Sequence, residues 1–208
     1  MPVQLVDHDV EKMGQELASC LAPGGEDYDH PHAALYDLAW YVFTEMANNV
    51  RQHSRGLGYA AAQTMRSEGL VRLAIADNGK GIRQSFVDAG LPWSHDVNDA
   101  EAILKALTSK ISSKGRPTNE GVGLTLVSGL VKQAHGWLLV VSGRGVVILK
   151  PGGEPNVSVL PSGASFDGTL VVAAFRQQHV KNFADLLHEA KVKAGLLQIR
   201  PSVGNFKT

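Results

Sequence analysis

Residues 70–81, with the sequence LVRLAIADNGKG, decide the fold class of this chain. The first seven residues are almost all apolar, which predicts a strand over 70–76 that lies centrally in a sheet. Asp77 to Gly81 form a polar turn with two glycines, which ends the strand. The turn places a carboxylate at the end of a buried strand, beside residues that allow the backbone to approach another group closely.

Apolar periodicity predicts the elements around this strand. Helices and strands are interleaved in the first part of the chain, and strands follow one another in the second. This order predicts an α+β fold, a two-layer α/β sandwich with helices over one face of a mixed, mainly antiparallel sheet. We expect helices over 6–21, 33–54, 98–107, 122–135 and 178–194, and further strands over 57–64, 137–143, 146–150, 157–161 and 169–175.

The amino-acid composition argues against several classes of function. The 208 residues contain 20 basic and 20 acidic side chains, and this balance argues against an electrostatic grip on nucleic acid or an acidic membrane. The single cysteine, Cys20, excludes a disulfide framework. The longest apolar run is far too short to span a membrane, and the acidic N-terminus does not resemble a signal peptide. We therefore expect a cytoplasmic protein with neither a nucleic-acid nor a membrane partner.

Three polar residues recur at helical spacing in the segment 33–54. At about 100° per residue, Glu45, Asn49 and His53 fall along one margin of the apolar stripe rather than on the solvent side. A carboxylate beside a core is costly unless it is paired or acts on a ligand. One interpretation is that Glu45 and Asn49 cap a nearby loop. The other is a general base and a metal ligand one helical turn apart.

The turn after the central strand has two interpretations as well. It is compatible with an ordinary surface turn. Alternatively, Asp77 accepts a hydrogen bond from an exocyclic amine such as adenine N6, while Gly79 and Gly81 let the backbone lie against a flat ring.

A third glycine group stands at the start of the helix expected over 122–135. Gly121 and Gly123 precede free backbone N–H groups, which attract anions at a helix N-terminus. The polar loop over 108–120 contains Lys110 and Lys114, which could add positive charge. The alternative is a simple surface loop or lid. Gly168-Thr169, at the start of the last strand, gives only supporting evidence.

These motifs, in this order, resemble the GHKL ATPase superfamily of gyrases, Hsp-type chaperones, histidine kinases and MutL-type proteins, whose ATP-binding domain has the Bergerat fold. The resemblance covers roughly residues 33–176. It rests on Glu45-x-x-x-Asn49-x-x-x-His53, Asp77-Asn78-Gly79-Lys80-Gly81-Ile82, Gly121-Val122-Gly123-Leu124 and Gly168-Thr169.

The resemblance implies ATP and Mg²⁺ as cofactors. Asn49 would ligate Mg²⁺, Glu45 would act as the catalytic base, and Asp77 would bind adenine N6. The implied nucleotide-binding residues are Asn49, His53, Asp77, Gly79, Gly81, Ile82, Lys110, Lys114, Gly121, Val122, Gly123, Leu124 and Thr169.

The chain departs from the larger members of the superfamily. We find no helical hairpin with a phosphoacceptor histidine, and only about 30 residues follow the last predicted strand. We therefore expect an N-terminal helix and loop over 1–30, a histidine-kinase-like ATP-binding domain over 31–177 and a C-terminal helix and tail over 178–208.

The chain as a whole is similar to stand-alone anti-sigma-factor-like proteins. That similarity implies ATP-dependent regulation of a protein partner, with a homodimer as a compatible assembly. Transfer of the γ-phosphoryl group to a partner's serine, slow ATP hydrolysis and a non-catalytic interaction domain with a relic site remain open alternatives.

Overall fold

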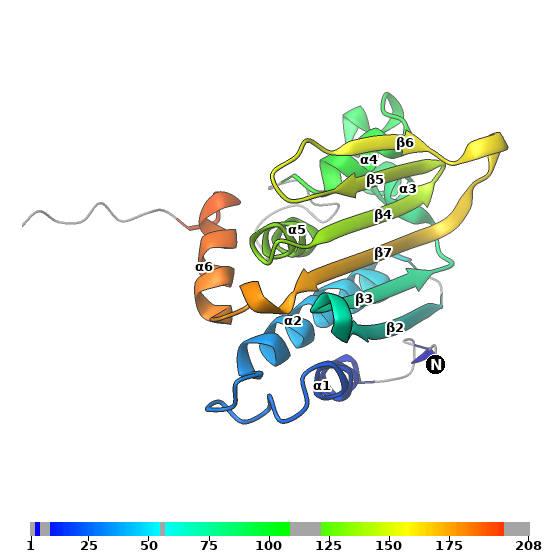
Figure 1. Ribbon diagram of the computed structural model, residues 1–208. Coiled ribbons are helices and arrows are strands. Elements are labelled where there is room, and N and C mark those ends of the chain that lie inside the picture. Colours follow the sequence, from blue (N-terminus) through cyan, green and yellow to red (C-terminus); the bar gives the residue numbers. More distant parts are fainter. Residues whose placement is uncertain (1–2, 5–8, 55–56, 109–121, 198–208) are drawn as a thin grey trace, which may run out of the picture.

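The structure of the protein is a computed structural model that describes residues 3–4, 9–54, 57–108 and 122–197. Its strands form one sheet in the order β1-β2-β3-β7-β4-β5-β6 (Figure 1). All neighbouring strands in the described part are antiparallel, so the predicted α+β sandwich with a mainly antiparallel sheet is confirmed, without a parallel pair. The strands are β1 (Val3–Gln4), β2 (Gly58–Met65), β3 (Leu70–Asp77), β4 (Trp137–Gly143), β5 (Gly145–Leu149), β6 (Asn156–Val159) and β7 (Phe166–Arg176).

The helices cover one face of this sheet, and α2, α3 and α4 lie behind the strands in Figure 1. α4 begins at the expected capping box, in which Asn98 and Glu101 each accept the other's backbone N–H. None of the helices in the described ranges is long and apolar enough to cross a membrane. The helices are α1 (Val10–Leu21), α2 (Ala33–Asn49), α3 (Gly81–Asp88), α4 (Asp99–Ala106), α5 (Gly123–Gln133) and α6 (Phe183–Lys193), with 3₁₀ turns at Arg66–Glu68, Pro92–His95, Pro161–Gly163 and Gln177–His179.

The hydrophobic core lies between the helices and the inner face of the sheet. Leu73, Ala173 and Leu138 pair across β3, β7 and β4, and all three are buried. The apolar stripe predicted along α2 is buried against them, with Leu38 and Val42 fully inaccessible. Residues of α1 and α6 belong to the same buried cluster, so both terminal helices pack onto the central sandwich.

Besides β1, which the sequence does not predict, and α6, which begins at Phe183 rather than at residue 178, two local features differ from the sequence-based expectation. The helix expected over 33–54 is α-helical only to Asn49, and Val50–Ser54 forms a π-helical turn. A π turn is wider than an α turn, so His53 does not keep the position that 100° spacing assigns to it. The second feature is α3, which periodicity does not predict because this eight-residue helix contains a single buried residue, Phe86.

Candidate functional site

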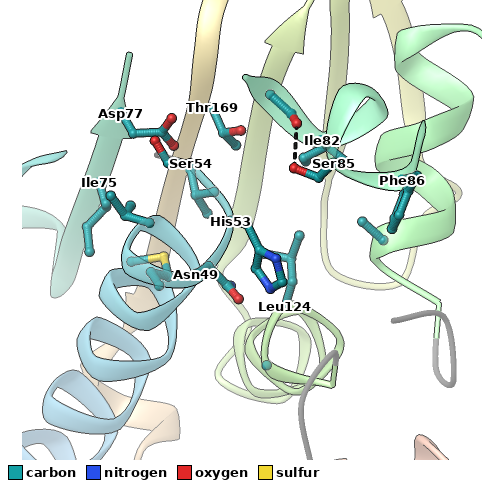
Figure 2. A pocket seen from close by; sticks show the side chains of 16 residues that line it. Asn49, His53, Ser54, Ile75, Asp77, Ile82, Ser85, Phe86, Leu124 and Thr169 are labelled. Atoms are coloured by element: carbon teal, nitrogen blue, oxygen red, sulfur yellow. Dashed lines mark hydrogen bonds between the residues drawn. The ribbon is translucent and has the colours of Figure 1, made fainter. Parts of the chain in front are cut away.

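A cavity of about 110 Å³ lies between the inner face of the sheet, the end of α2 and helices α3 and α5 (Figure 2). One water needs only about 10–15 Å³ of such space, so the cavity can take a larger group. Polar side chains stand at its two ends and apolar ones between them. The lining residues are Met46, Asn49, Val50, His53, Ser54, Ile75, Asp77, Gly81, Ile82, Ser85, Phe86, Ala106, Gly123, Leu124, Thr169 and Val171.

Asp77 forms one polar end. It is the last residue of β3, pairs with Thr169 in β7, and is only 6% exposed. Its Oδ1 accepts a hydrogen bond from the N–H of Gly79 at 2.8 Å. Figure 2 shows the oxygens of Asp77, Ser54 and Thr169 close together at this end. A carboxylate can accept several hydrogen bonds, so a buried one suits a ligand that donates.

Glycines keep the backbone close around this end. Gly81 has φ +75°, and a Cβ there would lie 2.8 Å from the Oγ of Ser142. A Cβ on Gly79 would overlap the backbone and hydroxyl oxygens of Ser54. Both positions therefore require glycine for steric reasons, and Gly81 does so for its backbone conformation as well.

Ser142 connects three elements behind the cavity. Its Oγ accepts from the N–H of Ile82 at 2.9 Å and donates to the carbonyl oxygen of Gly168 at 2.9 Å. The hydroxyl therefore holds the start of α3 against β7 from its own position on β4. The sequence offered no signal for this role, because the partners lie 60 and 26 residues away along the chain.

Asn49 and His53 form the other polar end. Figure 2 shows the Asn49 amide and the His53 ring directed into the cavity, near Leu124. The π-helical turn places His53 and Ser54 next to the turn formed by residues 77–81. The N–H of Lys80 in that turn donates a hydrogen bond to the carbonyl oxygen of Ser54 at 3.2 Å. Two motifs predicted separately from the sequence are thus joined by backbone hydrogen bonding.

Asn49 fits a magnesium ion better than a transition metal. Within the described residues, no three His, Cys, Asp or Glu side chains gather in a way that could hold a metal ion. Mg²⁺ prefers oxygen ligands, keeps several waters and takes only one or two protein ligands beside phosphate. The amide oxygen of Asn49 meets that requirement as a single protein ligand.

Glu45 lies outside the cavity lining but borders it. A Cβ on Gly123, which does line the cavity, would overlap the carboxylate of Glu45. Burial raises the pKa of Glu45, while a hydrogen bond with Tyr41 and the charge of Lys191 on α6 oppose that shift. Burial and the neighbouring Glu45 charge raise the pKa of the Tyr41 hydroxyl, so Tyr41 stays protonated and can donate to the carboxylate.

The N-terminus of α5 meets the cavity at Gly123 and Leu124. Its N-cap residue, Val122, makes no side-chain cap hydrogen bond within the described part of the chain. Backbone N–H groups at the first turn of a helix lack intrahelical partners, and the helix dipole favours an anion there. This end of the cavity suits a phosphate or a carboxylate.

The structure brings most of the sequence-predicted residues to one cavity. Asn49, His53, Asp77, Gly81, Ile82, Gly123, Leu124 and Thr169 line it. Gly79 and Val122 lie beside it, in the Asp77 turn and before α5, and Glu45 borders it through Gly123. Lys110, Lys114 and Gly121 lie outside the described residues.

Sequence reasoning missed the apolar walls of the cavity and two hydroxyl groups, those of Ser54 and Ser85. Ile75 and Val171 come from paired strands and Phe86 from α3, and their apolar type alone does not distinguish them from core residues. Ser54 could have been noticed, because it directly follows the predicted His53.

The chain was compared with known proteins. No family model matches it, and no curated protein does.

Proposed function

We propose that this chain is a Mg-ATP-binding domain of the GHKL type that regulates a protein partner in an ATP-dependent way. The observation that carries the proposal is the Asp77 carboxylate, almost buried at the end of a cavity with close-packed glycine backbone around it. Such a group recognises a flat ring that donates a hydrogen bond.

Adenine suits this end of the cavity. Its exocyclic amine would donate to Asp77, and Thr169 would support the contact from the neighbouring strand. Ile75, Ile82 and Phe86 offer apolar surface to the ring faces.

The phosphates would lie toward the other end. The first turn of α5, which has no side-chain cap among the described residues, would offer N–H donors, and Asn49 would supply an oxygen for the Mg²⁺ that neutralises the phosphates. His53 lies beside Asn49 at this end and can donate to or accept from the ribose or a phosphate (Figure 2).

Phosphoryl transfer to water or to a partner's serine is a second candidate. It rests on Glu45, a partly buried carboxylate whose pKa is raised and which stands against Gly123 at the phosphate end. In that role Glu45 would accept the proton of the attacking hydroxyl. Incubation with γ-labelled ATP, followed by assay of released and protein-bound label, separates transfer from binding alone.

Calorimetric titration tests the binding proposal. We expect ATP with Mg²⁺ to bind at least about tenfold more tightly than GTP, because guanine presents a carbonyl oxygen where adenine presents its amine, and a buried acceptor would face another acceptor. Adenosine serves as a control for the base end, since its affinity should not depend on Mg²⁺. Equal affinity for ATP and GTP, or no measurable ATP binding, contradicts the proposal.

A further inference from the structure

A groove of about 760 Å³ lies between α5, α6 and the residues that follow α4. Figure 1 shows α5 and α6 next to each other at one side of the molecule. No described residue lines both this groove and the cavity at Asp77, so the two are separate sites. A volume of this size can hold a small ligand or several side chains of a peptide. We call it the α5–α6 groove.

Small residues form the floor of the α5–α6 groove, where the two helices touch. A Cβ atom on Gly129 of α5 would lie 3.2 Å from the Cβ of Ala190 of α6. One turn further along α5, the Nε2 of Gln133 donates to the carbonyl oxygen of Leu186 at 3.1 Å, which fixes the two helices against each other. Leu107 and Leu186 add apolar surface to the lining. The small floor therefore leaves room for large apolar side chains of a ligand.

Apolar surface continues beyond the groove at the end of α6. Ala194 lines the groove, and Leu196 and Leu197, which follow it closely, are 37% and 40% exposed. The N–H of Leu196 donates to the carbonyl oxygen of Lys191 at 2.9 Å, so the C-cap of α6 fixes the backbone at this position. Exposed large apolar side chains beside an open groove favour contact with another molecule.

The charged residues of the described lining are mainly positive. Lys132 lines the groove from α5 and Lys193 from α6, and both side chains are exposed. Glu189 is the one acidic residue among the described lining residues, and its carboxylate forms an ion pair with Lys193 at 3.4 Å. The described lining therefore carries an excess of positive charge.

The end of the groove at His135 leads to further positive side chains. The rings of His135 and His179 stack, with their centres 4.0 Å apart and their planes at 17°. Partial burial and the positive charges of His135, Arg176 and Lys181 all lower the pKa of His179. Since the chain as a whole has no net charge, this concentration of cations is local. It attracts a ligand that carries carboxylates.

An amphipathic helix with acidic residues complements both features of the groove. From Thr125 to Gln133 the groove follows α5 for about 12 Å, the length of about two helical turns. Such a helix offers apolar side chains at i, i+3, i+4 and i+7 to the floor. Carboxylates beside that stripe would face Lys132 and the cations near His135. Nucleic acid would supply the negative charge but no apolar side chains for the floor.

Helix α5 separates the groove from the cavity at Asp77. Gly123 and Leu124 line the cavity, and Thr125, the next residue along the chain, lines the groove. A phosphate held at the first turn of α5 would therefore lie within one helical turn of a wall of the groove. This arrangement gives a direct route by which nucleotide could act on a molecule in the groove.

We propose that the α5–α6 groove binds an acidic amphipathic helix of the protein partner, with the apolar side chains of that helix on the floor and its carboxylates at the cationic end. This proposal rests on the proposed function for the existence of a partner that ATP regulates, but the docking itself requires no nucleotide.

Fluorescence anisotropy with a synthetic peptide tests the docking. The probe is a labelled peptide of about 14 residues, blocked at both ends, with leucines at i, i+3, i+4 and i+7 and mainly glutamates elsewhere. On the full chain without nucleotide we expect a dissociation constant of about 1–100 µM, which rises with salt. A peptide with lysines in place of the glutamates, and one with scrambled leucines, should each bind at least about tenfold more weakly. No measurable binding of the probe, or equal binding of all three peptides, overturns the proposal.

Two charge reversals on the chain have opposite expected effects. Lys132→Glu should weaken binding of the probe at least about tenfold, and Glu189→Lys should strengthen it about threefold or more. Lys12→Glu is the matched control, because Lys12 is an exposed lysine on α1 outside the groove. Circular dichroism checks the fold, and a gain of affinity in Glu189→Lys cannot result from unfolding. Unchanged affinity in both groove variants, or an equal loss in Lys12→Glu, contradicts the assignment.

The measurements separate this proposal from the proposed function. ATP binding without binding of the probe would refute the docking site alone, and binding of the probe without ATP binding would refute the nucleotide function alone. In a chain that binds both, ATP with Mg²⁺ should change the affinity for the probe at least about fivefold. An unchanged affinity overturns the route through α5. Displacement of the probe by an equal concentration of a single-stranded oligonucleotide would identify a general anion site and overturn the docking proposal.

Discussion

Gly168 lies so close to Asp77 that a Cβ atom at position 168 would overlap the backbone carbonyl oxygen of Asp77. Gly168 also has φ +108°, a conformation that other residues rarely adopt. This contact packs the start of β7 against the end of β3. The Asp77 carboxylate lines the cavity at the same point. The contact makes Asp77 a group whose position is determined by backbone packing rather than by its own flexible side chain.

Asp77→Asn should abolish or severely weaken ATP binding while the protein stays folded. The amide still offers an acceptor, but it loses the charge and adds an N–H₂ that must find partners at a site that is 6% exposed. Calorimetry gives the affinity, and circular dichroism checks the fold. Asp96→Asn, an exposed position outside the cavity, is the control. Unchanged affinity for ATP would remove Asp77 from adenine recognition.

Gly81→Ala should destabilise the protein more than Gly152→Ala, and it alone should weaken ATP binding. The two glycines have φ +75° and φ +68°, so the conformational cost is similar, about 1 kcal/mol or more. Only at Gly81 does the added methyl group meet another atom, the Oγ of Ser142 that holds Ile82 and Gly168. Denaturant unfolding gives both stabilities. If both variants lose a similar free energy of unfolding, the close contact between position 81 and the Oγ of Ser142 is unimportant.

Asn49→Ala and Glu45→Ala should separate binding from turnover. Asn49→Ala should weaken ATP binding in the presence of Mg²⁺ and leave adenosine affinity unchanged. Glu45→Ala should leave ATP affinity nearly intact, because Glu45 borders the cavity without lining it. In a protein that turns ATP over, Glu45→Ala should lower the rate by about 10²–10⁴-fold. Full turnover in that variant would assign Glu45 a structural role with Tyr41.

Glu45→Gln should stabilise the ligand-free protein at neutral pH and have little effect in acid. Burial raises the pKa of Glu45 in the folded state, so the folded protein holds this proton more tightly than the unfolded chain does. The stabilising contribution of the neutral acid is complete below the ordinary pKa of a glutamate and is lost as pH rises through the raised value. Glutamine stays neutral throughout. Denaturant unfolding at several pH values gives the free energy of unfolding of the variant and of the wild type. The difference between the two should grow as pH rises. A difference that stays constant would mean that Glu45 has an ordinary pKa.

The sequence by itself determined most of the elements of this protein. Central strand β3, the apolar stripe of α2 and the capping box at Asn98 and Glu101 depend on local spacing, and all three occur in the structure. It also singled out Asp77, Asn49 and Gly123, which prove to line one cavity. Local periodicity and glycine placement are properties of short segments, which explains why they can be recognised without the fold.

Only the tertiary structure decided how these segments meet. The hydrogen bonds of Ser142 and the overlap between Gly168 and Asp77 join residues that lie tens of positions apart, where no local pattern reaches. The π turn after Asn49 changes the direction of His53, which helical spacing alone places elsewhere. Strand register sets Thr169 opposite Asp77, because pairing decides which side chains stand in one row across the sheet.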